Sequence, residues 1–201
     1  MELLGYSAWL MNIGFIGTGH IASSVIEGIL KSKLKVNKIY ISPRNQIIAK
    51  KLSKKFKKVN ISQHNQQLVD MSDWVFLAVT PLVGENILRH LYFRNNKKVI
   101  SFISTIDLNT LKQYTTSANI TRVLPLPFIG IKKGPIIICP PDKAVKSFFK
   151  QLGKVIEIKN EEVSKNFWTT SSFMAPFYEM LAVKSNWLVS KGVKRKDAED
   201  Y

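Results

Sequence analysis

Three small residues near the start of the chain constrain its fold more than any other feature. Gly17, Gly19 and Ala22 directly follow the apolar run Ile13–Ile16, and a helical pattern begins within them. In a βαβ unit, the first glycine permits a tight turn, the second lets the backbone approach a pyrophosphate, and the third small residue lets the helix pack closely on the strand. The segment predicts a dinucleotide-binding loop, formed by Gly17, Thr18, Gly19, His20, Ile21 and Ala22.

The rest of the chain alternates between strand and helix signals. Short runs rich in β-branched and aromatic residues predict strands at 12–16, 38–41, 58–61, 74–79, 99–103, 120–124, 136–139 and 155–158. Helical periodicity predicts helices at 19–32, 45–56, 81–92, 107–114 and 141–152. Strands separated by helices of this length form βαβ units with right-handed crossovers. We therefore expect an α/β fold of the Rossmann type, with a doubly wound, mostly parallel sheet.

Three segments follow from this pattern. Residues 1–10 are apolar but lack a basic start and a cleavage site, so we expect a poorly ordered extension, with Met11 as the natural start of translation. Residues 11–160 form the nucleotide-binding domain. Residues 161–201 show no strand-like alternation and predict the start of an all-helical domain. A short helical segment buries little by itself, so we expect it to pack on a partner chain or on further helices.

The charge balance is strongly basic, with 30 Lys and Arg against 14 Asp and Glu and a net charge of +16. The densest run, Lys50–Lys58, could neutralise nucleic-acid phosphates, but apolar residues recur in it and just before it at helical spacing: Ile47, Ile48, Leu52 and Phe56. We interpret the lysines as the solvated face of an amphipathic helix and expect no nucleic-acid partner, because arginine, which favours base and phosphate recognition, is scarce.

Other classes of site are excluded by composition. The single cysteine, Cys139, excludes an intrachain disulfide framework and a cysteine-cluster zinc site, and it favours a reducing compartment such as the cytoplasm. No long uncharged apolar run predicts a membrane span. We therefore expect no metal site and no membrane partner, and instead a small-molecule substrate.

The end of the second predicted strand favours NADP over NAD. An NAD site usually places an acidic residue there to bind the ribose hydroxyls, but no Asp or Glu lies between Glu27 and Asp70. Ser42 and Asn45 can donate hydrogen bonds, and Arg44 can pair with a 2′-phosphate. We predict that NADPH is preferred over NADH. The alternative is that this segment is only a turn followed by a helix N-cap.

A second wall of the cofactor site is expected at the end of the fourth predicted strand. Ligands of doubly wound sheets bind outside the carboxyl ends of the strands. The apolar run from Val75 ends in Thr-Pro, so we expect the nicotinamide ribose to border Ala78, Val79, Thr80 and Pro81. The alternative is a buried strand followed by a helix cap.

Taken in order, these motifs resemble the pyrroline-5-carboxylate reductase family over residues 11–201. The matching segments are Ile13–Ala22, Ser42-x-Arg44, Phe76–Pro81, Arg122–Pro125 and Leu152–Val155, together with Asn65 and Gly134. Asn65 matches a family asparagine that reaches the cofactor ribose. The resemblance implies NADPH-dependent reduction of a cyclic imine carboxylate to proline, in a homodimer or higher assembly formed through the C-terminal helices.

The chain departs from the family pattern where substrate chemistry is expected. The family's M-P-N-T-P corresponds to Leu124–Phe128, without the Asn and Thr, and its S-G-S-G-P-A-Y corresponds to Ser172–Tyr178, where both glycines and the middle serine are replaced. The family's later glycine- and threonine-rich signature has no counterpart before Tyr201. The cofactor half of the resemblance therefore transfers well and the substrate half poorly.

Three functions remain open. The first is a pyrroline-5-carboxylate-type imine reductase. The second is a related NADP-dependent oxidoreductase with a less polar substrate, indicated by Leu126, Phe173 and Met174, and the third is a non-catalytic truncated dinucleotide-binding protein. Candidate substrate-contacting hydroxyls are those of Thr80, Ser172 and Tyr178, with Ser171 beside them, and each could equally be a cap or packing group.

Overall fold

The computed structural model describes residues 10–116 and 119–201, so the expected extension lies outside the described residues except for Leu10. The chain divides into two compact units. The first ends at Glu161, and the second spans Glu162–Tyr201.

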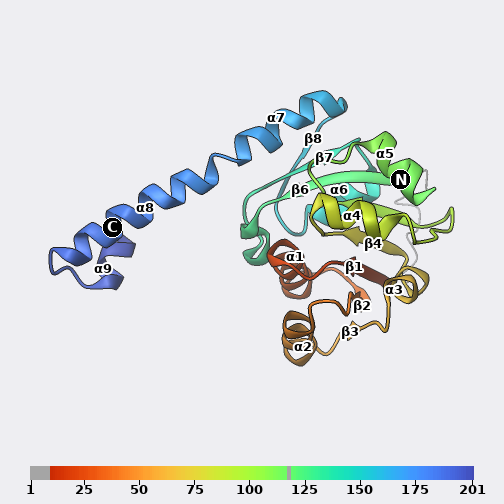
Figure 1. Ribbon diagram of the computed structural model, residues 1–201, viewed down its shortest axis with the longest axis horizontal. Helices are drawn as coiled ribbons and strands as arrows, with labels where there is room; N and C mark the ends of the chain where they lie inside the picture. Colours follow the sequence, from red (N-terminus) through yellow and green to blue (C-terminus); the bar gives the residue numbers. More distant parts are fainter. Residues whose placement is uncertain (1–9, 117–118) are drawn as a thin grey trace, which may run out of the picture. The chain divides into compact units, whose positions relative to one another are not determined.

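The first unit contains an eight-stranded sheet in the order β3-β2-β1-β4-β5-β6-β7-β8 (Figure 1). Its strands are β1 (Met11–Ile16), β2 (Val36–Ile41), β3 (Val59–Ile61), β4 (Trp74–Leu77), β5 (Lys98–Ser101), β6 (Ile120–Pro125), β7 (Pro135–Cys139) and β8 (Lys154–Glu157). Neighbouring strands are parallel except β6 and β7. The segment between these two strands is too short for a crossover helix and holds a 3-10 turn, η1 (Pro127–Ile131), so the chain returns antiparallel. The Rossmann-type, mostly parallel sheet is confirmed.

Two apolar clusters form the core, one on each face of the sheet. The helices of this unit are α1 (His20–Lys31), α2 (Gln46–Lys55), α3 (Asn65–Met71), α4 (Pro81–Leu88), α5 (Leu108–Thr115) and α6 (Lys143–Phe149). Buried residues of α1, α2 and α6 share one cluster with Ile13 and Phe15 of β1. Buried residues of α3, α4 and α5 share the other cluster with Ile16. This division follows from the alternation of side chains along each strand, which sends Phe15 and Ile16 to opposite faces.

Each predicted strand is present, but the helix predictions were incomplete. The sequence pattern missed α3, because this seven-residue helix begins with the polar run Asn65–Gln67 and buries only Leu68 and Val69. The helix predicted at 81–92 ends at Leu88, where the last turn is followed by an irregular segment. Asp142 is the N-cap of α6, accepting the Val145 N–H at 2.9 Å.

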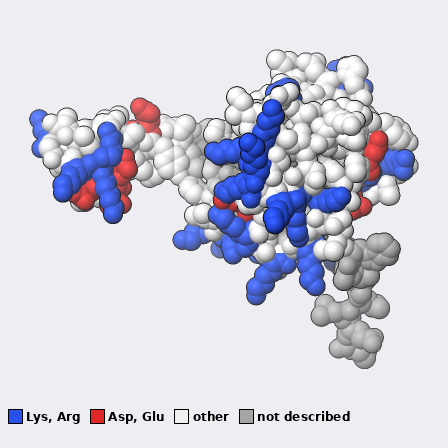
Figure 2. All heavy atoms as spheres, turned by 90° about the horizontal axis from the view of Figure 1, so that it is seen from below, with Lys and Arg blue, Asp and Glu red and all other residues white. Residues whose placement is uncertain are grey.

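The lysine-rich helix α2 presents its charges to solvent, with one correction. Ala49 and Leu52 are buried, but Ile47, predicted on the apolar face, is 83% exposed because it lies in the first turn on the outer side of the helix. Lys50, Lys51 and Lys54 are exposed. Figure 2, viewed from the side where α2 lies, shows basic side chains predominating over acidic ones.

The second unit is helical. It contains most of α7 (Glu161–Ser171) and all of α8 (Met174–Ser190) and α9 (Arg195–Asp200). The Ser185 hydroxyl donates to the Ala198 carbonyl at 3.0 Å, which ties α9 to α8. Several large apolar side chains of this unit are exposed: Val163, Phe173, Phe177, Tyr178, Met180, Val183 and Trp187. Among the described residues, the structure has no helix with the length and apolar character to cross a membrane.

Candidate functional site

A cleft of about 170 Å³ lies at the carboxyl ends of β1, β2 and β4. This is the place where the strand order reverses, since β2 lies on one side of β1 and β4 on the other. The residues lining it are Gly17, Thr18, Gly19, Ser42, Arg44, Asn45, Asn65, Ala78, Val79, Thr80 and Ile87. Ten of the fourteen residues predicted to bind the cofactor therefore meet in one cleft.

The two glycines of the loop play different parts. Gly17 has φ +102°, and a Cβ there would lie 2.3 Å from the Ala78 carbonyl oxygen, so the fold itself requires glycine. Gly19 has φ −67°, which any residue adopts, and a Cβ there would meet nothing within 4 Å. The missing side chain at Gly19 thus leaves open space at the start of α1, as a close approach of a ligand to the backbone demands.

The N-terminus of α1 is suited to an anion. Among the described residues no side chain caps this twelve-residue helix, and its first turn carries no acidic residue. The first amide N–H groups of a helix lack internal acceptors and lie at the positive end of the helix dipole. A phosphate group placed beside Gly19 would satisfy them.

Ser42 joins the glycine loop to α3. Its buried hydroxyl accepts the Gly17 N–H at 3.1 Å and donates to the Asn65 Oδ1 at 2.7 Å. Because the Asn65 oxygen is directed to Ser42, the Asn65 NH₂ group remains as a donor for another acceptor. The structure thus orients Asn65 to donate toward a bound hydroxyl or phosphate oxygen.

Arg44 and Asn45 form the exposed rim where β2 ends. Both side chains line the cleft, and no acidic side chain is found among the described residues that line it. Asn45 also caps α2, its Oδ1 accepting the Ile48 N–H at 3.2 Å. The helix-cap interpretation of this segment is therefore correct for Asn45, while Arg44 leaves a positive charge at the rim.

The opposite wall consists of Ala78, Val79 and Thr80. The Ala78 N–H donates to the Ile16 carbonyl at 2.8 Å, which continues the register of β4 against β1. Thr80 is the N-cap of α4, but its side chain makes no capping hydrogen bond. Ile87, two turns further along α4, also lines the cleft and was not predicted. Its position on the same helix face as Thr80, seven residues on, was the available signal.

Four residues predicted to bind the cofactor do not line the cleft. Ala22 is buried in the core, where it lets α1 pack closely on the sheet, so its part is structural. Ile21 packs against the same core. His20 is exposed on the first turn of α1, and Pro81 occupies the first turn of α4.

The remaining candidate hydroxyls lie in the second unit, so their approach to the cleft stays a prediction. Ser172 donates to the Thr169 carbonyl at 2.6 Å, and Ser171 donates to the Phe167 carbonyl at 2.7 Å. Tyr178 is 45% exposed and packs edge-on against Phe177. The two serines thus make the local helix bonds expected of capping or packing hydroxyls.

The shifted carboxyl groups lie outside the cleft. The Thr110 N–H, donated at 2.7 Å, lowers the pKa of Asp107, the N-cap of α5. Burial acts to raise the pKa of Asp142, but the Lys98 ammonium and the Val145 N–H lower it further, so the net shift is downward. In the described ranges, no group of three or more His, Cys, Asp or Glu side chains could hold a metal ion.

Comparison with known proteins agrees with this geometry. Residues 12–105 match the family described as "NADP oxidoreductase coenzyme F420-dependent". Pyrroline-5-carboxylate reductase of Arabidopsis thaliana is 26% identical over 195 residues, covering 92% of this chain and 70% of the relative. The resemblance to the pyrroline-5-carboxylate reductase family is confirmed. ComE operon protein 4 of Bacillus subtilis is 30% identical over 119 residues, which are 57% of this chain and 43% of that protein.

Solved structures of pyrroline-5-carboxylate reductases share the fold. The Streptococcus pyogenes enzyme superposes with a TM-score of 0.77 at 22% identity, over 94% of this chain and 74% of its own. The Plasmodium falciparum pyrroline carboxylate reductase, solved with NADP bound, gives a TM-score of 0.78 at 20% identity, over 94% and 73%. The chain therefore shares the Rossmann-type fold of these reductases and the helices that follow it.

Proposed function

We propose that the chain binds NADPH in the cleft and reduces a cyclic imine, as in the conversion of 1-pyrroline-5-carboxylate to proline in proline biosynthesis. The observation that carries the proposal is the uncapped start of α1 beside Gly19, facing a rim that holds Arg44 and no described acidic residue. The match to an NADP oxidoreductase family and to pyrroline-5-carboxylate reductases supports it. The single cysteine is consistent with a cytoplasmic reaction.

The cleft residues fit a dinucleotide phosphate in a definite order. The amides around Gly19 would hold the pyrophosphate, and Asn65 would donate to the adenosine ribose. Arg44 would pair with the 2′-phosphate, which distinguishes NADPH from NADH. Val79, Thr80 and Ile87 would form the wall beside the nicotinamide, with the Thr80 hydroxyl available to the substrate.

In this reaction the cofactor and the protein would have separate roles. NADPH supplies the hydride, and the protein orients the acceptor and excludes water. Reduction of a protonated imine consumes a positive charge, so the reaction needs no strong acid from the chain. The cleft agrees with this, because the described residues lining it include serine and threonine side chains but no carboxylic acid or histidine.

A second candidate is reduction of a less polar imine. Leu126 stands where the family pattern has Asn, as the N-cap of η1 without a side-chain bond, and Phe128, 38% exposed, stands where the pattern has Pro. These side chains could not hydrogen-bond a substrate carboxylate. A compound without that carboxylate would suit them better.

Nucleotide binding followed by an imine screen tests these functions. Titration calorimetry should show NADPH binding more tightly than NADH, and NADPH oxidation should then be followed with pyrroline-5-carboxylate and with 2-methylpyrroline, which lacks the carboxylate. Turnover of the first compound supports the first proposal, and turnover of the second alone supports the second. NADPH binding without turnover of any imine favours the non-catalytic alternative, and no binding contradicts all three.

A further inference from the structure

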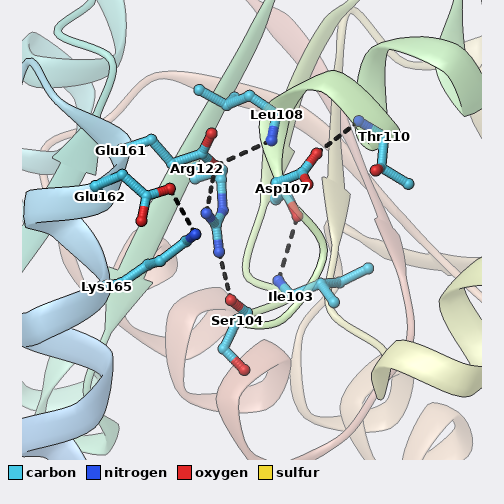
Figure 3. Close-up of polar contacts among 10 residues, drawn as sticks. Ile103, Ser104, Asp107, Leu108, Thr110, Arg122, Glu161, Glu162 and Lys165 are labelled. Carbon is cyan, nitrogen blue, oxygen red and sulfur yellow. Dashed lines mark hydrogen bonds and ion pairs between the residues drawn. The ribbon is translucent and has the colours of Figure 1, made fainter.

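A fully buried guanidinium lies in the first unit, on a residue that does not line the cleft. Arg122, on β6, has a side chain only 1% exposed; it pairs with the Glu161 carboxylate and donates to the Ser104 carbonyl (Figure 3). A buried charge is costly unless it is paired and hydrogen-bonded. The planar guanidinium donates in fixed directions, so it can hold two segments at a defined separation.

The same carboxylate reaches the start of α5. Glu161 Oε1 accepts the Leu108 N–H at 2.9 Å, at the first residue of that helix, where a negative charge is favourable. Ser104 lies within the loop 102–107 between β5 and α5, and Leu108 directly follows it. Arg122 and Glu161 therefore fix this loop both at its middle and at its end.

The loop in turn packs behind the wall of the cleft. A Cβ built on Gly84 of α4 would lie 2.8 Å from Ile103 Cδ1, 3.5 Å from Val79 Cγ2 and 3.7 Å from Ile106 Cδ1. The two loop isoleucines and Val79 thus meet over one glycine, and Val79 lines the cleft. Because interiors are close-packed, a displacement of the loop is transmitted to Val79.

We propose that Arg122 is a positioning residue for hydride transfer. Through Glu161 and the loop 102–107, it sets the position of Val79 and so the place of the nicotinamide ring. This inference rests on the proposed function, because it assigns the nicotinamide half of the cofactor to that wall. The adenosine half is assigned to Arg44 and Asn65, so the two halves of the cofactor should respond differently when Arg122 is changed.

The test compares two ligands on Arg122→Lys. The variant keeps the positive charge but cannot donate to Glu161 and Ser104 in the same fork geometry. We expect its affinity for 2′,5′-ADP, which has no nicotinamide, to stay within about twofold of wild type. Its NADPH affinity should fall severalfold, and kcat for the imine that the wild type reduces should fall by about 10- to 100-fold, because small misplacements of reacting atoms have effects of this size.

A second variant and a matched control guard against unfolding. If Arg122→Lys fails to fold, Glu161→Gln takes its place in the test. This variant keeps an acceptor for the Leu108 N–H and should show the same pattern of affinities and kcat with a smaller loss. Lys98→Met breaks the Lys98–Asp142 pair, 2.5 Å long, which involves the amino end of β5. It should leave both affinities and kcat near wild type, while melting curves measure the folded fraction of every variant.

The outcomes separate this inference from the proposed function. Equal losses for 2′,5′-ADP and NADPH, or no loss for either with unchanged kcat, overturn the positioning role. If the wild type binds NADPH but reduces no imine, the proposed function fails, and the ratio of the two affinities still decides the role of Arg122. If the wild type binds neither nucleotide, both proposals fail.

Discussion

The Ser42 hydroxyl at the cleft and several serine hydroxyls of the helical unit are used differently, although Ser185 in that unit does tie α9 to α8. The Ser42 hydroxyl joins Gly17 and Asn65, which lie 25 and 23 residues away in the sequence. Ser172 and Ser190 instead donate to carbonyls three residues earlier in their own chain segment. Bonds between distant segments fix the geometry of a site, whereas local bonds do not. The cleft is thus formed within the first unit, while the helical unit exposes apolar side chains that another protein surface could cover.

The largest effect is expected at Gly17, where both the cleft and the fold depend on the absence of a side chain. Gly17→Ala places a Cβ against the Ala78 carbonyl at an unfavourable positive φ, so we expect the free energy of unfolding to fall by about 3 kcal/mol. Urea denaturation measures this loss. The matched control is Gly19→Ala, which should change stability by less than about 0.5 kcal/mol. Equal losses for both would show that the loop has a different conformation.

A larger side chain at Gly19 separates binding from folding. Gly19→Val adds its side chain to the open space beside the start of α1, where the pyrophosphate is expected. We expect NADPH affinity to fall by at least about 100-fold, because the phosphate can no longer approach the amides. The melting temperature should remain near that of wild type. Unchanged affinity, measured by calorimetry, would show that the phosphate binds elsewhere.

Arg44→Ala examines the rim of the same cleft. Removal of a charge-assisted contact to the 2′-phosphate should weaken NADPH by about 10- to 100-fold, the equivalent of about 1.5–3 kcal/mol. NADH has no such phosphate and should bind about as before. Lys50→Ala is the control, since Lys50 is exposed on α2 and does not line the cleft. Similar losses for NADPH and NADH would remove Arg44 from cofactor discrimination.

The exposed apolar side chains of α8 provide a test of the helical unit. We propose that a second copy of the chain covers them, as the resemblance to the reductase family implies. Val183 and Trp187, 60% and 59% exposed, lie one helical turn apart. Val183→Glu with Trp187→Glu should weaken self-association by at least about tenfold, because two charges would have to be buried. Sedimentation velocity would contradict this proposal if the wild type were a monomer.

The sequence predicted the strands well because strands covered on both faces are continuous apolar runs. It also found most of the cleft, since the glycine loop and the strand ends occupy fixed places in a doubly wound sheet. It missed α3, whose few apolar residues give no periodic pattern. The Ser42–Asn65 bond and the Arg122–Glu161 pair were beyond prediction, because each depends on how segments 23 or 39 residues apart pack in space.

The smallest expected effect concerns Asp107, which ends the loop fixed by Arg122. Its Oδ1 caps α5, and Asp107→Ala should lower the free energy of unfolding at pH 7 by about 1 kcal/mol. Hydrogen bonding by the Thr110 N–H lowers the Asp107 pKa below 3.8, so the unfolded chain binds the proton more tightly than the folded one. The stabilisation is therefore complete above pH 3.8 and decreases as the pH falls through the lowered folded-state pKa.

Urea unfolding of wild type and Asp107→Ala at several pH values between 7 and 2 measures this dependence. The difference between the two proteins should shrink at the acidic end of the series, provided that both remain folded there. Asp107→Asn is the matched control, because an amide oxygen can still accept the Thr110 N–H but does not titrate in this range. It should keep most of the stability and lose the part of the pH dependence that belongs to Asp107. A difference between wild type and Asp107→Ala that stayed constant down to pH 2 would show that the cap does not depend on the charge of the carboxylate.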